Sequence, residues 1–213
     1  YLTESAKKGV QIYALVGEPE WALNNYQDEI LTEIERVRRI NKLVDADVGI
    51  KGIVIDVEPY TLDEWNENSD NIMKSYTELI KLFYDNKESL ELYICVPFYY
   101  DDLGYESFLN ECISQYCDGL LVMNYSVGNE SDNIKTEIMM CEKYDKAIYS
   151  IYELNAPNDI VKNSNTYFGG KMSDIEKNYK EMKNRYHFIL VGYPNITKFM
   201  NNLASFCLEK CKK

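Results

Sequence analysis

Short apolar runs alternate with longer amphipathic stretches along the chain. The runs at 10–16, 52–58, 90–98, 119–125, 147–152 and 188–191 are rich in β-branched and aromatic residues, which favours buried strands. Between them, apolar residues recur three or four positions apart, the spacing of a helix face that packs on a sheet. Strands that alternate with helices predict an α/β fold with parallel strands and right-handed crossovers.

The expected helices are marked by caps and by their apolar spacing. We expect helices over 2–8, from Ile30 to Ile40, from a cap at Asp70 to Phe83, over 107–116, around 134–141, over 173–185 and from Phe199 to Phe206. The segment 155–170 is polar and contains Pro157 and a Gly169-Gly170 pair, so we expect a loop that acts as a lid.

Polar groups gather where the predicted strands end, which is typical of a TIM (β/α)8-type barrel. No glycine-rich phosphate loop follows any strand, so the nucleotide sites of open doubly wound sheets are not indicated. A barrel needs eight strands, and the chain opens inside a helix. We therefore expect one barrel domain over 1–213 that covers about six βα units, strands three to eight, with two further units upstream of Tyr1.

Composition narrows the class of ligand. The chain has 213 residues and 46% hydrophobic residues, as in a globular protein, and its net charge of -12 argues against nucleic acid or an anionic membrane as partner. A neutral ligand is therefore favoured. No apolar run reaches the length of about 18 residues typical of a transmembrane helix. The compartment stays open: secreted or cell-surface if an upstream signal segment is removed, cytoplasmic otherwise.

The cysteines and the histidine limit the possible chemistry. Six cysteines occur without a CxxC pair, which favours free buried thiols, although Cys112 with Cys117, or Cys207 with Cys211, remain possible disulfides. The single histidine, His187, excludes a His-rich metal cluster. We expect no metal and no cofactor, and carboxylates are left as the acid-base groups.

Two carboxylates end the second predicted strand. Asp56 and Glu58 lie two positions apart, directly before Pro59, so side-chain alternation places them on the same face. Burial at a strand end raises the pKa of a carboxyl group, which is a common catalytic arrangement. Glu153 follows the fifth predicted strand. The catalytic candidates are therefore Glu58, Asp56 and Glu153.

Other polar and aromatic residues at the strand ends are candidates for substrate binding. Each tyrosine among them is alternatively a packed ring, and Trp21 is either a plate for a sugar face or a cover for the core. With Asp56 and Glu58, Asp101 also offers oxygen ligands for magnesium or calcium, which leaves a metal-dependent hydrolase as an alternative. The substrate-binding candidates are Tyr125, Asn124, Trp21, Glu18, Tyr60, Tyr100, Asp101 and Tyr193.

The stretch from Gly52 to Glu58 resembles the fourth-strand motif of chitinase-like (family 18) glycoside hydrolases, and Met123-Asn124-Tyr125 resembles their sixth-strand motif. The resemblance implies that Glu58 is the general acid, that Asp56 orients it, and that Tyr125 contacts the acetamido group of the substrate. This chain departs from the motif: Lys51 and Val54 stand where the family has two earlier acids, and Ser126 replaces the acid or amide after the tyrosine.

A second resemblance covers most of the chain in order. It is to a little-characterised bacterial group of glycoside hydrolase-like barrels, and it implies that the present strands are numbers three to eight. The matching stretches are Gly17-Glu18-Pro19-Glu20-Trp21-Ala22, Asp56-Val57-Glu58-Pro59-Tyr60, Glu64-Trp65 and Pro97-Phe98-Tyr99-Tyr100-Asp101.

Together these features predict a glycoside hydrolase-like protein that acts on a poly- or oligosaccharide with Glu58 as acid. Two schemes remain open. Either the substrate's own acetamido group is the nucleophile, or Glu153 is the nucleophile in a retaining pair with carboxyl groups about 5 to 5.5 Å apart. A non-catalytic carbohydrate-binding or scaffold barrel derived from a hydrolase is the alternative function.

Overall fold

The chain divides into two compact units. The computed structural model describes residues 1–170, 174, 177 and 187–191. The first unit contains Tyr1–Val122 and Thr136–Ile148, and the second contains Met123–Lys135 and the chain from Tyr149 onward. No helix among the described residues combines the length and the apolar character that crossing a bilayer requires.

Parallel strands that follow one another in chain order form the sheet of the first unit. Its strands are β1 (Tyr13–Val16), β2 (Gly52–Ile55), β3 (Glu91–Pro97) and β4 (Gly119–Met123). In the register, Leu15 pairs with Val54 and Val54 pairs with Tyr93, so β2 lies between two parallel neighbours. All four residues of β2 are buried, which explains its run of apolar side chains.

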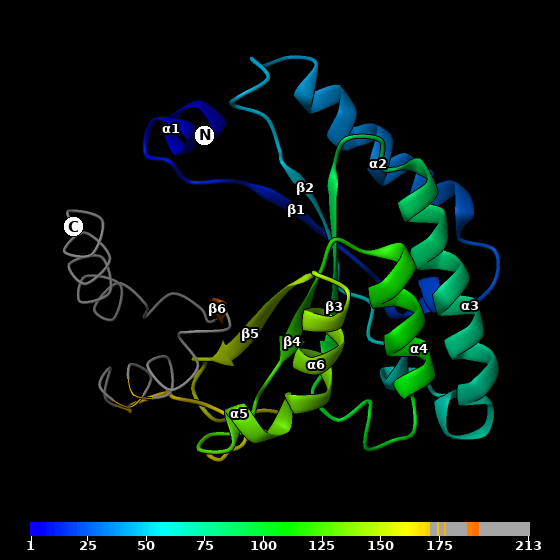
Figure 1. Ribbon diagram of the computed structural model, residues 1–213, viewed down its shortest axis with the longest axis vertical. Helices are drawn as coiled ribbons and strands as arrows, with labels where there is room; N and C mark the ends of the chain where they lie inside the picture. The colour runs from blue at the N-terminus through cyan, green and yellow to red at the C-terminus, as the bar shows by residue number, and fades with distance from the viewer. Residues whose placement is uncertain (171–173, 175–176, 178–186, 192–213) are drawn as a thin grey trace. The chain divides into compact units, whose positions relative to one another are not determined.

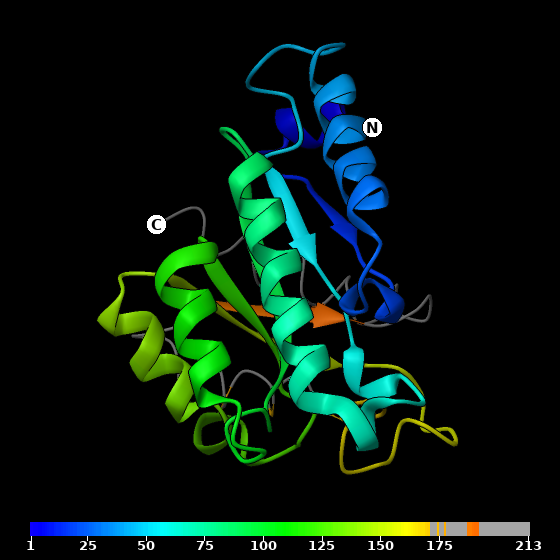
Figure 2. The same cartoon turned by 90° about the vertical axis from the view of Figure 1, so that its right-hand side faces the viewer.

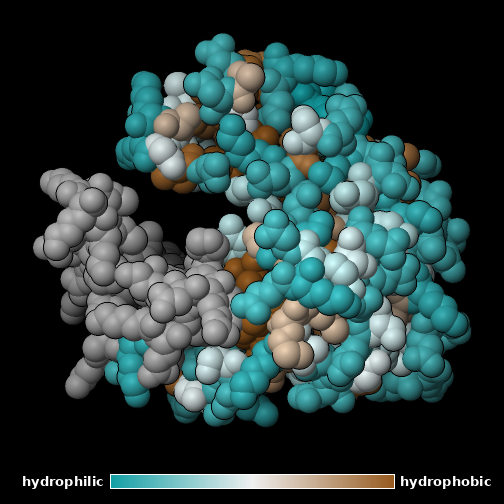
Figure 3. All heavy atoms as spheres, in the orientation of Figure 1, coloured by the Kyte–Doolittle hydropathy of each residue, from teal (hydrophilic) through white to brown (hydrophobic). Residues whose placement is uncertain are grey.

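Helices cover one face of this sheet. Figures 1 and 2 show α2 (Gln27–Asn41), α3 (Trp65–Asn86) and α4 (Glu106–Glu111) on the same side of the strands. Alternate strand residues point into this layer and have no exposed surface, and burying each contributes about 2 kcal/mol. The outward surface over α2 and α3 is mainly hydrophilic (Figure 3), as expected for amphipathic helices. The core residues from the strands are Ile53, Ile55, Leu92, Ile94, Val96, Leu120 and Val122.

Shorter elements complete the first unit. They are α1 (Leu2–Lys7), the 3-10 turns η1 (Pro19–Ala22) and η2 (Pro59–Thr61), the π-helical turn η3 (Cys112–Tyr116) and α6 (Lys135–Lys143). The turns η1 and η2 follow β1 and β2, and they contact each other and α3. The loops that leave the carboxyl ends of two neighbouring strands are therefore in contact.

The second unit contains most of β5 (Ala147–Glu153), together with β6 (His187–Val191) and α5 (Glu130–Asn133). β5 and β6 pair in parallel, with Tyr149 opposite His187 and Glu153 opposite Val191. In the loop after β5, the hydroxyl of Thr166 donates hydrogen bonds to the carbonyls of Glu153 and Asn155. This contact returns the loop to the end of β5.

The predicted alternation of strands and helices and the parallel pairing are confirmed. The barrel is not, because no pairing among the described strands closes the sheet, and the numbering of six units as barrel strands three to eight stays a prediction, as does the single domain. The predicted helices at 173–185 and 199–206 lie outside the described residues, apart from Asp174 and Lys177.

One predicted helix boundary was wrong. α3 begins at Trp65 rather than after Asp70, and it is kinked at Asn68, which has non-helical dihedral angles. At the kink, the Asn68 side chain accepts a hydrogen bond from the Asn71 side chain at 2.6 Å, and the helix extends on both sides of it. The helix expected around 134–141 is confirmed as α6, and the short helix α5, which the sequence did not predict, ends before Ile134.

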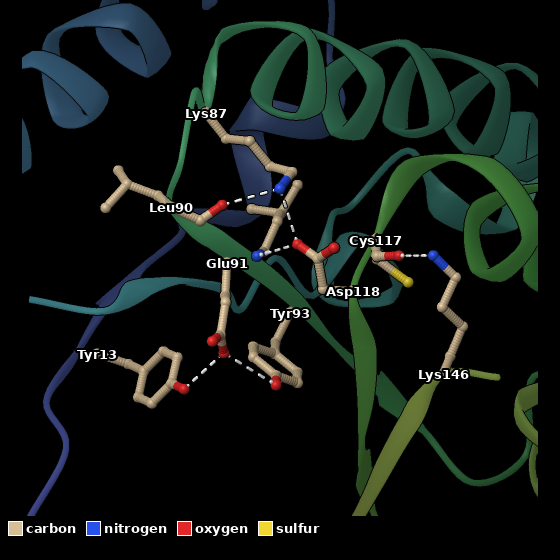
Figure 4. Close-up of polar contacts among 9 residues, drawn as sticks. Tyr13, Lys87, Leu90, Glu91, Tyr93, Cys117, Asp118 and Lys146 are labelled. Atoms are coloured by element: carbon tan, nitrogen blue, oxygen red, sulfur yellow. Dashed lines mark hydrogen bonds and ion pairs between the residues drawn. The ribbon is translucent and has the colours of Figure 1, made fainter.

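Polar contacts connect the segments that enter β3 and β4 (Figure 4). The Lys87 ammonium donates to the carbonyl of Leu90 at 2.9 Å and pairs with Asp118 at 2.9 Å. The same Asp118 carboxylate accepts the Leu92 N–H at 2.8 Å, at the start of β3. Nearby, Lys146 donates to the carbonyl of Cys117 at 2.7 Å. A half-buried ion pair therefore joins the end of α3 to the starts of two strands.

Replacing Asp118 by alanine removes both the partner of Lys87 and the acceptor of the Leu92 N–H. Because the Lys87 side chain is only 15% exposed, we expect the free energy of unfolding, measured with urea, to fall by about 2 kcal/mol. The control Glu4→Ala breaks an ion pair whose side chains are 66% and 68% exposed, and it costs less than about 0.5 kcal/mol. Equal losses in the two variants contradict this role of Asp118.

Candidate functional site

Asp56 and Glu58 lie directly after β2, in the first unit. The strand ends at Ile55, earlier than the sequence predicts, and the Asp56 N–H makes the last contact with β1, to the Val16 carbonyl at 2.8 Å. Both acids are half-buried, whereas Val57 between them is buried. The two carboxyl groups are close enough that the charge of Asp56 acts on Glu58.

The η2 turn holds Glu58 and Tyr60 in place. Pro59 occupies the first position of this 3-10 turn, where its missing N–H costs no hydrogen bond. The Glu58 carbonyl accepts two hydrogen bonds from Thr61, from the N–H at 3.0 Å and from the hydroxyl at 2.7 Å. These contacts hold the backbone carbonyl of Glu58 in place.

Asp56 lies in a buried environment with few hydrogen-bond donors. Burial raises the pKa of its carboxyl group, and a hydrogen bond from the Cys95 thiol on β3 partly offsets this effect. Its Oδ1 atom, like the hydroxyls of Tyr76 and Tyr100, is buried without a hydrogen-bond partner in the described part of the chain. Tyr76 and Cys95 are close enough to Asp56 for its charge to raise their pKa values further, after burial. The site therefore favours the protonated form of Asp56 more than water does.

The pKa of Glu58 is raised mainly by burial and also by the nearby charge of Asp56. A hydrogen bond from the Tyr60 hydroxyl stabilises the charged carboxylate and lowers the pKa in part. A carboxyl group in this setting keeps its proton closer to neutral pH than an exposed glutamic acid does. It is thus suited to donate a proton to a leaving group.

Four tyrosines, which we call the tyrosine cluster, adjoin these acids: Tyr60, Tyr99, Tyr100 and Tyr105. The ring of Tyr60 packs edge to face with Tyr99 at 5.9 Å and with Tyr100 at 6.3 Å between centroids. Tyr100 packs in the same way on Tyr105 at 5.8 Å. Burial raises the pKa of Tyr100, as do the charges of Tyr99 and Glu58. Tyr60, Tyr99 and Tyr100 therefore place aromatic rings near Glu58.

The loop after β1 approaches the site closely at Gly17. A Cβ atom at this position would lie 2.1 Å from the backbone oxygen of Asp56, a distance that no side chain tolerates. Glycine is thus required where β1 leaves the sheet, because the backbone of the next strand occupies the space of a side chain.

Two of the predicted binding residues of the first unit lie on the loop after β1. Glu18 is exposed, and Trp21 in η1 packs against Phe83 of α3, with ring centroids 6.4 Å apart. This packing fits the role of Trp21 as a cover for the core. A stacking role toward sugar for Trp21 and a contact from Glu18 stay predictions.

Asp101 follows the tyrosine cluster in the chain and is half-buried. Its carboxylate accepts the N–H of Asp102 at 2.9 Å. Among the described residues, no group of three or more Asp, Glu, His or Cys side chains is arranged to hold a metal ion. The magnesium or calcium alternative therefore gains no support from Asp56, Glu58 and Asp101.

The remaining candidates belong to the second unit or lie outside the described residues. Asn124 is 1% exposed, and its amide donates to the Glu130 carbonyl at 2.8 Å and to Ser150 at 3.1 Å. The Tyr125 carbonyl accepts a hydrogen bond from Asn165, and Glu153 accepts the Asn155 N–H at 2.6 Å. Their roles toward a substrate stay predictions. Tyr193 lies outside the described residues.

The structure thus brings together Asp56, Glu58, Tyr60 and Tyr100 among the predicted site residues. It adds Cys95, Tyr76 and Tyr99, which the sequence did not single out. Alternation along β3 places Cys95 on the same face as Tyr93, but the strand register that brings it beside Asp56 is not readable from the sequence. Cys95, Cys112, Cys117 and Cys141 are free and buried, so the Cys112–Cys117 disulfide is not formed; Cys207 and Cys211 lie outside the described residues.

Two neighbours shift the pKa of Glu58 in opposite directions, which can be tested by substitution. Asp56→Asn removes a negative charge and should lower this pKa, whereas Tyr60→Phe removes a donor to the carboxylate and should raise it. Carbon-13 NMR titration of the glutamate carboxyl groups measures both shifts. As control, Asp63→Asn alters an exposed carboxylate in the next turn and should leave Glu58 unchanged. Shifts of the same sign in the first two variants contradict the described geometry.

No family model matches this chain, and no curated protein matches it in sequence. Among solved structures, one from Aquifex aeolicus VF5 is 11% identical, covering 90% of this chain and 79% of its own, with a TM-score of 0.45. The xylanase CbXyn10B, a TIM-barrel glycoside hydrolase, is 14% identical over 89% of this chain and 67% of its own, with a TM-score of 0.45. An uncharacterised protein from Clostridium thermocellum that binds two copies of 5-methyl-5,6,7,8-tetrahydrofolic acid is 12% identical over 92% and 94%, with a TM-score of 0.39. Likeness at this level carries no argument about activity, and it gives the chitinase-like resemblance no specific support.

Proposed function

We propose that the protein is a glycoside hydrolase-like enzyme acting on a poly- or oligosaccharide, with Glu58 as the general acid. The observation that carries the proposal is the position of Glu58, a half-buried carboxyl group that follows a fully buried strand, beside a second carboxyl group and a tyrosine donor; burial there raises its pKa. Perturbed carboxyl groups of this kind are concentrated at catalytic sites.

In this proposal Glu58 gives its proton to the glycosidic oxygen as the bond to the leaving sugar breaks. Asp56 keeps the pKa of Glu58 high before the transfer, because a second negative charge at this place is unfavourable. Tyr60 has the opposite role. Its hydroxyl donates to the carboxylate that remains after the proton has left, and it fixes the orientation of that group.

The second catalytic group has two candidates. A neighbouring acetamido group of the substrate needs no further acid from the protein, whereas a retaining mechanism uses Glu153 as nucleophile. Oε1 of Glu153 accepts a hydrogen bond from the Asn155 N–H at 2.6 Å, which holds the orientation of this side chain.

The tyrosine cluster favours a second function, binding of carbohydrate without turnover. Aromatic rings provide apolar faces against which sugar rings pack, and Tyr60 and Tyr99 are only half-buried. Under this alternative, Glu58 and Asp56 accept hydrogen bonds from sugar hydroxyl groups and no bond is broken.

Glu58→Gln tests the proposal on a panel of aryl glycosides and amino-sugar polymers. We expect turnover by the natural chain to fall at least about 100-fold in the variant, the usual contribution of a general acid. Since Glu58 must carry its proton, activity should persist to higher pH than an ordinary glutamic acid allows, and decline as Glu58 ionises.

Glu64→Gln is the matched control, because Glu64 is exposed at the start of α3 and should not alter turnover. Glu153→Gln separates the two schemes: a comparable loss supports the retaining pair, and unchanged turnover supports the acetamido group. Binding of the polymers without turnover by the natural chain favours the alternative function. Equal turnover by the natural chain and Glu58→Gln overturns the assignment of Glu58.

A further inference from the structure

Glu137 is a fully buried acid that the proposed reaction does not use. It lies on α6 in the first unit with 0% of its surface exposed. Neither of its carboxylate oxygens has a hydrogen-bond partner within the described part of the chain. A charged carboxylate without a donor is one of the most costly groups to bury. Glu137 must therefore be neutral, with its proton bound, while it is buried in this way.

The charged groups near Glu137 also favour its protonated form. The pKa of Glu137 is raised to about 8, mainly by burial, and the carboxylates of Asp101 and Asp102, from the loop after β3, contribute in the same direction. On its own helix the neighbouring titratable group is Cys141, a buried thiol whose pKa burial raises to about 12, so this thiol stays neutral. The charge of Lys146 lowers the pKa of Cys141 in part.

The two aspartates belong to the 99–105 loop, which carries three of the four residues of the tyrosine cluster. Within the 99–105 loop, the N–H of Leu103 donates to the Tyr99 carbonyl at 3.1 Å, and the N–H of Tyr105 donates to the Tyr100 carbonyl at 2.9 Å. Gly104 has a φ of +85°, which allows the tight return of the chain. Hydrogen bonds thus join the start of this short loop to its end, and its tyrosines act on the site around Glu58 whereas its aspartates act on Glu137.

We propose that Glu137 is a pH-sensitive switch that holds the 99–105 loop against α6 when protonated and releases it when ionised. Ionisation places a third negative charge opposite Asp101 and Asp102 in a buried position without donors. In this proposal, the free-energy cost of the ionised Glu137 side chain falls only when water solvates it, and solvation requires the loop and α6 to separate. The inference does not depend on hydrolase activity, because it concerns the position of the loop alone.

The direction of the pH effect follows from the two states. In the open state Glu137 is solvated and has an ordinary pKa near 4.5, whereas in the closed state its pKa is about 8. An acid with a raised pKa stabilises the closed state at low pH, and this stabilisation is lost as pH rises between the two values. The equilibrium constant for opening therefore rises up to about tenfold per pH unit in this interval.

Hydrogen exchange of the amides at 99–105 measures the opening between pH 5 and 8, as protection factors that remove the intrinsic pH dependence of exchange. In the natural chain we expect protection to fall with rising pH, up to about tenfold per unit. In Glu137→Gln, a neutral side chain of the same shape, protection should be high and independent of pH. Glu142→Gln, an exposed acid on the same helix, is the control and should behave as the natural chain does.

A second variant separates electrostatic coupling from a loss of packing. Asp101→Asn with Asp102→Asn removes the facing charges and lowers the pKa of Glu137 in the closed state, whereas the ordinary pKa of the open state does not change. The fall in protection should therefore begin at the same pH as in the natural chain and end at a lower pH. A pH dependence that is absent in the natural chain, or unchanged in Glu137→Gln, overturns the switch. Protection that rises with millimolar calcium at pH 8 in the natural chain also overturns it, in favour of a cation site.

Discussion

The free-energy cost of removing carboxyl groups from water determines the acid-base properties of the candidate site in the first unit. β2 is buried along its whole length by neighbouring strands, so residues just beyond its end are only partly solvated. Asp56 and Glu58 occupy these positions, and burial is the largest cause of the raised pKa of each. Their acid character is thus a consequence of where the strand ends, and the neighbouring side chains only adjust it.

The supply of hydrogen-bond donors decides what each buried acid can do. Glu58 receives a hydrogen bond from Tyr60, and Asp56 receives one from a thiol, a weak donor. Glu130 in the second unit is also buried, yet its carboxylate accepts hydrogen bonds from the Tyr167 hydroxyl and, at 3.0 Å, from the Gly128 N–H. Such a satisfied acid stabilises a loop, whereas Glu137, without donors, depends on its proton.

The loops after the strands, more than the strands themselves, bring these groups together. Gly17 lets the loop after β1 reach the backbone of Asp56, and η2 directs Glu58 and Tyr60. The 99–105 loop then connects the tyrosine cluster to Glu137 on a different helix. One short segment thus carries charged and polar side chains that act on both sites of the first unit.

The sequence by itself determined the α/β class, the places of the strands and the acids at the end of β2, because these depend on local periodicity and on Pro59. It did not determine the closure of the sheet, the kink at Asn68, or the break between α5 and α6. The neighbours of Asp56 and the isolation of Glu137 also emerged only from the tertiary structure. Cys95 and Tyr76 meet Asp56 through strand register and helix packing, and Asp101 meets Glu137 through a loop turn. Such contacts join residues far apart in the chain, where no local pattern records which side chains will meet.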